Sequence, residues 1–227
     1  MNEILNESFH QAVKEYFYLM NRRYPEKPTL KLICDHHRLT GVQRTILFRG
    51  ITSDHRAHVR KGKLIPDRDH WEGKYFLIDG YNVLYTIMNH LTGKLLFIGN
   101  DGIMRDTGND FNDVDSRKLF SRAVDVFVDF LGTTRIASAK VYFDSQVPGS
   151  KEDAEELVAA VKRLSIEVDI YLHEAVDKVL SEIKNGNAVC TSDSEIIDAT
   201  GAKVVDAARY ALESKYKVHP LILLELI

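Results

Sequence analysis

Four aspartates in the second half of the sequence stand where short apolar runs end or where the next helix should begin. Asp79 follows the run Tyr-Phe-Leu-Ile, Asp144 closes a second such run, and Asp193 comes just after the run Ala-Val-Cys. Asp177 falls in the first turn of an expected helix. Clustered carboxylates repel one another unless a cation neutralises them, and oxygen ligands without a set of His or Cys favour Mg²⁺ or Mn²⁺. The four residues therefore predict a site for Mg²⁺ or Mn²⁺.

Such a site suggests metal-assisted hydrolysis, because a bound cation can activate a water and stabilise the charge on a reacting phosphodiester. Each aspartate also has a structural explanation, since Asp at a strand end often caps the following helix. For Asp177 or Asp193 taken alone, capping is the better explanation; four aspartates on one rim are harder to explain that way. Asn82 is expected either to orient a water or phosphate or to hydrogen-bond its own turn. Asp198 and Asp206 are expected to be structural, although Asp198 lies one turn into the helix after Asp193 and could reach the site.

Alternating strands and helices position these residues. Over residues 69–227 the alternation predicts an α/β domain of the three-layer α/β/α kind, with helices on both faces of a parallel sheet. A strand order of 3-2-1-4-5 makes the first and fourth strands neighbours, so that Asp79 and Asp193 face each other across the crevice at the switch point. The expected strands are at residues 75–79, 139–144, 166–172, 188–193 and 203–206.

A hairpin is expected between the first strand and a long helix over residues 115–131. Residues 94–98 and 102–106 form the strand pair, because the Asn-Asp-Gly between them is a strong turn signal. We interpret the hairpin as an insertion. The aspartates in and after it should form a solvated acidic loop, with a lid over the site as the second interpretation: Asp101, Asp106, Asp110, Asp113 and Asp115.

Residues 1–68 predict a small all-helical domain ahead of the α/β domain. Apolar spacing indicates a helix over residues 6–20, a second helix starts near Pro28, and a third begins at Thr40, where Thr40 and Gln43 have the spacing of a capping box. The second and third helices resemble a helix-turn-helix arrangement.

This first part of the chain is basic, whereas the net charge of the whole chain is −3. Residues 1–70 hold 13 Lys and Arg against 8 Asp and Glu, and the remainder holds 17 against 25. The asymmetry fits a module that binds nucleic acid beside an acidic metal site, and two domains that simply attract each other fit it nearly as well. Phosphate contacts are predicted for basic residues of this part, with solvated side chains, and a solvated linker at residues 55–63, as the alternative. These residues are Arg22, Arg23, Arg38, Arg44, Arg49, Arg60, Lys61 and Lys63.

Several classes of protein are excluded. The first residues lack the layout of a signal peptide and no apolar run is long enough to span a bilayer, so a cytoplasmic location without membrane contact is the default. Cys34 and Cys190 have no paired metal-ligand spacing and are expected to be buried reduced thiols. The apolar tail at 220–227 should pack on the N-terminal domain, with a homodimer contact as the alternative.

The acidic motifs resemble those of PIN-domain ribonucleases. The likeness lies in the Ile-Asp-Gly-Tyr-Asn-Val run containing Asp79, the Tyr-Phe-Asp at Asp144, the Val-Asp at Asp177 and the Thr-Ser-Asp at Asp193. It covers about residues 74–210 and is closest to the branch with an Asp-Gly-Tyr-Asn opening. The resemblance implies a PIN-like fold, with the first, third and fourth of these aspartates as catalytic metal-binding carboxylates and Asp144 as a fourth metal ligand.

The resulting hypothesis is a metal-dependent endoribonuclease whose N-terminal module helps to hold RNA. The second hypothesis is a catalytically inert PIN-like module that binds RNA or a protein partner, and Lys178, where the family usually has a carboxylate, fits either a phosphate contact or a weakened metal site. An aspartate-nucleophile phosphatase ranks last, because Tyr81 stands where its second acid is needed. The full chain, including residues 17–25, also resembles an uncharacterised prokaryotic family whose front module is a domain of unknown function.

Overall fold

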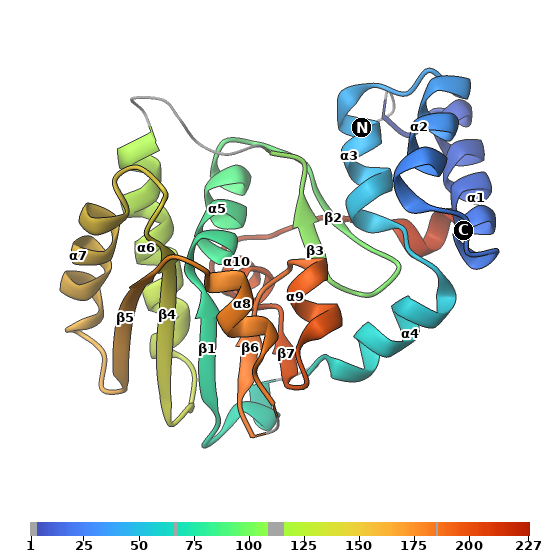
Figure 1. Ribbon diagram of the computed structural model, residues 1–227. Helices are drawn as coiled ribbons and strands as arrows, with labels where there is room; N and C mark the ends of the chain where they lie inside the picture. The colour runs from blue at the N-terminus through green and yellow to red at the C-terminus, as the bar shows by residue number, and fades with distance from the viewer. Residues whose placement is uncertain (1–3, 66–67, 109–115, 185) are drawn as a thin grey trace. The chain divides into compact units, whose positions relative to one another are not determined.

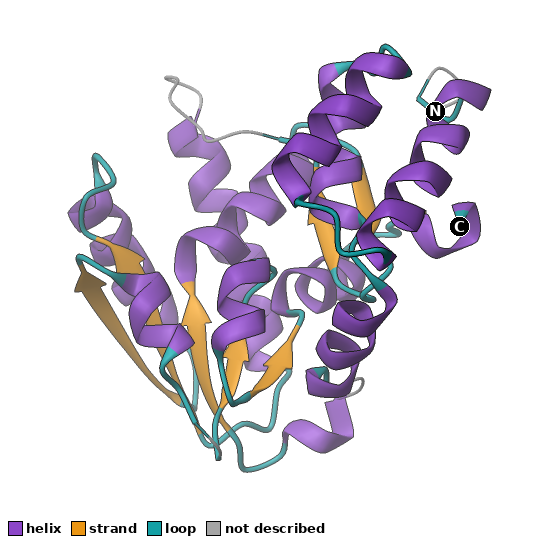
Figure 2. Ribbon diagram, turned by 45° about the vertical axis from the view of Figure 1, so that its right-hand side comes forward, coloured by secondary structure: helices purple, strands orange, loops and turns teal. Residues whose placement is uncertain are grey.

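The larger part of the protein is a three-layer α/β/α unit, as the sequence predicts. The structure, a computed structural model, describes residues 4–65, 68–108, 116–184 and 186–227. Five parallel strands lie in the order β5-β4-β1-β6-β7, which is the predicted order 3-2-1-4-5, and their arrows point the same way in Figure 2. The strands are β1 (Tyr75–Asp79), β4 (Ser138–Asp144), β5 (Glu167–His173), β6 (Ala188–Cys190) and β7 (Lys203–Val205).

Helices cover both faces of this sheet (Figure 1). On one face α5 (Gly80–Leu91), α6 (Ser116–Gly132), α7 (Ser150–Val161) and α10 (Ala207–Lys215) pack against one another, and on the other α8 (Val176–Ser181) packs against α9 (Ser194–Ala199).

The apolar residues of β1 explain this layering, because alternate side chains of a strand point to opposite faces. Leu77 packs with Val176, Leu180 and Ile196 of the α8 and α9 layer. Phe76, its neighbour in the strand, meets the ring of Trp71, which is the last residue of a short 3₁₀ turn, η1 (Arg68–Trp71). Burial on both faces is why β1 is a continuous apolar run rather than an alternating one.

The other unit is built on the predicted N-terminal helices. The capping box is present: the Thr40 side chain accepts from the Gln43 amide, and the Gln43 side chain accepts from the Thr40 amide. The basic tract after these helices is itself a helix rather than a linker. The helices are α1 (Glu7–Asn21), α2 (Glu26–His36), α3 (Gly41–Gly50) and α4 (Asp54–Lys63).

Two later segments complete this helical unit. The predicted hairpin forms as β2 (Leu96–Ile98) and β3 (Met104–Asp106), and β8 (Leu221–Ile222) pairs with β2 in parallel before a final turn, η2 (Leu223–Leu226). Phe97 and Leu223 are fully buried in the same apolar core as the helices. The tail therefore packs on the N-terminal module, as the sequence predicts.

The protein is thus divided differently from the single boundary expected between residues 68 and 69. One compact unit gathers residues 1–62, 94–107 and 219–227, and the other gathers 63–93 and 108–218. The core of the helices also contains Phe97 and Leu223, so later segments of the chain help to enclose it. None of the described helices is long and apolar enough to cross a membrane. Both cysteines are free and buried, as expected.

The acidic loop is a second correction. Asp101 and Asp106 are only 1% and 3% exposed, so they form neither a solvated loop nor a lid. Asp101 pairs with Arg105 and with Arg60, each at 2.9 Å, and it stabilises a buried turn of the hairpin. Residues 110, 113 and 115 lie outside the described residues.

Candidate functional site

Asp79 ends β1 and begins α5. Its Oδ1 atom accepts a 3.3 Å hydrogen bond from the Asn82 amide and so caps the helix, while its Oδ2 atom accepts a 2.9 Å bond from the Thr191 hydroxyl. The residue is 8% exposed. Both carboxylate oxygens are therefore held in place by neighbouring elements, and the group lies at the carboxyl end of the central strand.

Asp193 lies beyond the next strand, β6, and caps α9. Its Oδ1 atom accepts hydrogen bonds of 2.7 Å and 3.2 Å from the Glu195 and Ile196 amides. Capping thus accounts for one oxygen of Asp193 and leaves Oδ2 without a hydrogen bond among the described residues.

Asp177 behaves differently from the capping role considered for it. It lies in the first turn of α8, whose N-cap is Ala175 and which has no side-chain cap hydrogen bond. Asp177 is exposed, and helix capping does not explain it. Asp144, at the end of β4, accepts a 2.8 Å bond from the Gln146 amide and is half-buried.

Electrostatics show that these carboxylates share one region. The pKa of Asp79 is raised to about 7, mainly by burial and also by the charges of Asp193 and Asp177, against hydrogen bonds that lower it. Desolvation also raises the pKa of Asp177, followed by repulsion from Asp193, Asp144 and Glu195. The four predicted aspartates are thus brought together, with Glu195 as an additional carboxylate that the sequence did not single out.

The carboxylates are nevertheless spread more widely than the first ligand shell of a metal ion. Among the described residues they do not bring three oxygens within 4.8 Å of one another. Mg²⁺ usually keeps several waters and binds through one or two carboxylates, so a hydrated ion suits this spacing. The donor set fits Mg²⁺ or Mn²⁺, because every donor is a carboxylate oxygen and a cation relieves the repulsion that raises the pKa of Asp177.

The Asn82 side-chain oxygen bonds to the residue after Thr191 rather than to its own turn. This Oδ1 atom accepts hydrogen bonds from the amide and hydroxyl of Ser192, at 2.8 Å and 3.0 Å. Thr191 makes a parallel link, because its hydroxyl donates to Asp79 and accepts from the Asp193 amide at 3.1 Å. Thr191 and Ser192 were not among the predicted site residues, although a Thr-Ser pair between a buried strand and an aspartate is a usable sequence signal.

Asp206 and Lys63 have structural roles. Asp206 is buried and caps α10 through the Arg209 amide, as expected. Lys63 is not free to contact phosphate as predicted, because its ammonium donates to backbone carbonyls at the end of α9, including those of Ile197 and Thr200 at 2.6 Å and 2.7 Å. The ammonium satisfies carbonyls that the helix end leaves unpaired.

Arg60 is a further correction in the predicted RNA-binding set. It is 5% exposed and forms an ion pair with Asp101 inside the helical unit, so its guanidinium is not available to a phosphate at the surface. Arg49 likewise bonds the Asp106 carbonyl at 2.8 Å.

The remaining basic side chains of the predicted set stay on the surface of the helical unit. Arg44 pairs with Asp35, and the Arg22 guanidinium lies 5.0 Å from the ring centre of Tyr18. Arg23, after α1, and Arg38, after α2, have positive φ angles of 62° and 50°. The exposed members are Arg22, Arg23, Arg38 and Lys61.

Comparison with known proteins gives the family of the chain. A family described as Domain of unknown function (DUF5616) matches residues 68–210, and one described as Protein of unknown function (DUF434) matches residues 8–63. The Uncharacterized protein MJ0935 of Methanocaldococcus jannaschii is 30% identical over 207 residues, which cover 91% of this chain and 97% of that protein. No solved structure matches the chain. Because the first match spans more than half of the chain and the relative spans nearly all of it, the protein belongs to the DUF5616 family, with a DUF434 module in front.

Proposed function

We propose that the protein hydrolyses phosphodiester bonds in RNA with the help of Mg²⁺ or Mn²⁺. The observation that carries the proposal is the gathering of Asp79, Asp177 and Asp193 at the carboxyl ends of parallel strands, where burial and, after it, mutual repulsion raise the pKa of the first two. Open α/β sheets bind their ligands at this edge. RNA is the substrate that the resemblance to PIN-domain ribonucleases implies.

The residues of the site have different roles in the proposed metal binding. Asp79 is a rigid ligand, because Thr191 and Asn82 hold its two oxygens. Asp177 and the free oxygen of Asp193 are the adaptable ligands, and Asp144 borders them. A bound divalent ion supplies activation of a water and stabilisation of phosphodiester charge. Lys178, exposed beside Asp177, would contact a substrate phosphate.

A catalytically inert module that binds RNA or a protein is the second candidate. The wide spacing of the carboxylates favours it, because a weak metal site would leave binding without hydrolysis. Lys178 fits this alternative as well, since its ammonium can neutralise part of the acidic rim without a metal ion.

Calorimetric titration with Mn²⁺ and incubation with a labelled RNA pool distinguish the two candidates. The protein, Asp79→Asn and Asp177→Asn are compared with Asp125→Asn, which removes an exposed carboxylate on α6 away from the strand ends. We expect the first two variants to lose Mn²⁺ binding at this site and cleavage together, and the control to keep both. RNA binding without cleavage by the unsubstituted protein would contradict the hydrolase and support the inert module.

A further inference from the structure

We propose that Glu15, His36 and His37 form a second metal site, which binds a divalent transition-metal ion such as Zn²⁺. One ligand atom from each of the three side chains lies within 4.8 Å of the other two. Among the described residues, no other group of three His, Cys, Asp or Glu side chains has its ligand atoms this close together. The site lies entirely within the helical unit and is independent of the strand-end carboxylates.

The local fold holds the two histidines against α1. His36 is the last residue of α2, and His37 follows as its C-cap, with its amide bonded to the Ile33 carbonyl at 3.0 Å. The Ser8 hydroxyl on α1 donates a 2.8 Å bond to the His37 carbonyl. The His37 backbone is therefore fixed on both sides, and Glu15 approaches from the same helix as Ser8.

The side chains present a suitable set of donors. His37 Nε2 lies 2.8 Å from Glu15 Oε2, and the rings of His36 and His37 are perpendicular with centres 4.8 Å apart. Two imidazoles and a carboxylate are the three protein ligands of many open zinc sites, in which a fourth position is left for water or a ligand. Imidazole suits Zn²⁺, Fe²⁺, Co²⁺ and Ni²⁺ better than Mg²⁺, so this site differs in metal preference from the strand-end site.

Only a small adjustment is needed to reach metal-binding distances. Zinc–ligand distances of about 2.0–2.2 Å in a tetrahedron place the ligand atoms roughly 3.4 Å apart. Glu15 and His36 are exposed, so their side chains can rotate by that amount without disturbing the packed core.

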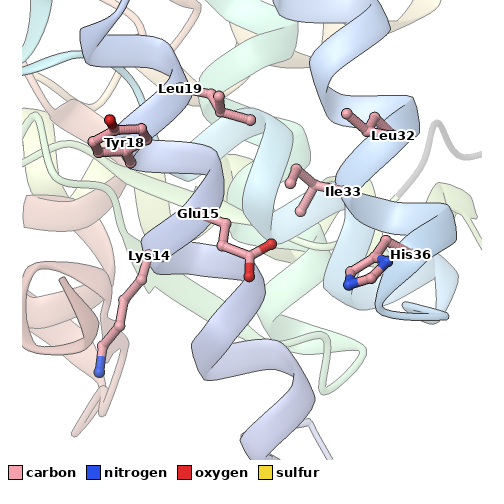
Figure 3. A pocket seen from close by; sticks show the side chains of 7 residues that line it. All are labelled: Lys14, Glu15, Tyr18, Leu19, Leu32, Ile33 and His36. Carbon is pink, nitrogen blue, oxygen red and sulfur yellow. The ribbon is translucent and has the colours of Figure 1, made fainter.

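A surface pocket of about 500 Å³ adjoins the site between α1 and α2. Figure 3 shows the Glu15 carboxylate and the His36 ring in its wall, across from each other. Lys14 contributes a positive charge, and Leu32 and Ile33 contribute apolar surface. The pocket gives a water or a small anion access to the fourth coordination position.

His36 distinguishes a metal site from a simple ion pair. If Glu15 and His37 only form the 2.8 Å contact seen here, His36 is a bystander and its removal has no effect on metal binding. If the three bind a metal ion, His36 is a ligand. Loss of outer-shell partners alone lowers metal affinity about 10–100-fold, so loss of a ligand should lower it at least about tenfold.

The test uses the full chain without a histidine tag, titrated with Zn²⁺ and with Co²⁺, whose visible spectrum reports nitrogen ligands. His36→Ala and Glu15→Gln are compared with His55→Ala, an exposed histidine of α4, and with Asp79→Asn, which disables the strand-end site. We expect the first two variants to bind Zn²⁺ at least about tenfold more weakly and to lose the Co²⁺ spectrum, and the two controls to retain both. Unchanged Zn²⁺ affinity and Co²⁺ spectrum in His36→Ala would overturn the proposal, as would equal loss in His55→Ala.

Discussion

The Thr191 hydroxyl donates a 2.9 Å hydrogen bond to Asp79 Oδ2, which joins the ends of two neighbouring parallel strands. The same hydroxyl accepts from the Asp193 amide at 3.1 Å. One buried oxygen atom thus sets the separation of two of the proposed catalytic aspartates, and it lowers the cost of ionising Asp79.

The stability of the metal-free protein should fall with rising pH because of Asp79. Its pKa is about 7 in the fold against an ordinary value of 3.8, so between these pH values the folded state holds a proton that the unfolded state has released. The free energy of unfolding should therefore decrease by up to about 1.4 kcal/mol per pH unit over this window and level off above pH 7. Urea unfolding in EDTA from pH 4 to 8.5 measures this change in the free energy of unfolding.

Asp79→Asn removes this titration, so the difference between the two proteins isolates the contribution of Asp79. Asp125→Asn should keep the slope of the unsubstituted protein. A difference between Asp79→Asn and the unsubstituted protein that does not vary with pH would show that Asp79 ionises normally.

Thr191→Val should raise the pKa of Asp79 above about 7, because the hydrogen bond that favours the ionised form is lost. A hydrogen bond to a charged group contributes about 1.5–3 kcal/mol, so Mn²⁺ binding at pH 7 should weaken by roughly tenfold or more and recover at higher pH. Calorimetry at pH 7 and pH 8.5 measures both effects. Thr191→Ser keeps the hydroxyl and should bind as the unsubstituted protein does; equal weakening in both variants would point to packing instead.

Asp101→Asn should strongly destabilise the helical unit. Asp101 compensates the charges of Arg60 and Arg105 in the interior, and removal of one partner of a buried ion pair typically costs about 3–5 kcal/mol. The free energy of unfolding and amide exchange in α4 and β3 measure the loss.

The matched control is Asp35→Asn, which breaks exposed pairs with Lys31 and Arg44 and should cost less than about 1 kcal/mol. Similar losses for the two substitutions would mean that the buried pairing contributes no more than a surface one.

Leu223→Ala and Leu224→Ala form a second matched pair. Leu223 is fully buried in the helical core, whereas its neighbour is 55% exposed. We expect the first substitution to cost about 2–5 kcal/mol of unfolding free energy and the second to have little effect. Chemical denaturation measures both, and equal small effects would show that the tail is not part of the core.

The sheet and its acidic rim could be predicted because their signals are local. Apolar runs such as the one before Asp79 mark buried strands, and their order along the chain with right-handed crossovers leaves few topologies. A capping box such as Thr40 with Gln43 is equally local, since it depends on two residues three apart.

Pairing between distant residues could not be predicted. Arg60 and Asp101 are 41 positions apart, and each reads as a solvated charge until the fold brings them together. The helix α4 was missed because it is almost entirely polar, and only Ala57 and Arg60 of its residues are buried. The link from Asn82 to Ser192 spans 110 positions and depends on the same strand pairing as the site.

The late segments of the helical unit have a consequence for synthesis. Residues 63–218 contain the whole second unit, whereas the first unit also needs residues 219–227. At about 5–20 residues per second, roughly 8–30 s separate the emergence of residue 62 from that of residue 219. The unit that starts first is therefore finished last, and during that interval its core lacks Leu223.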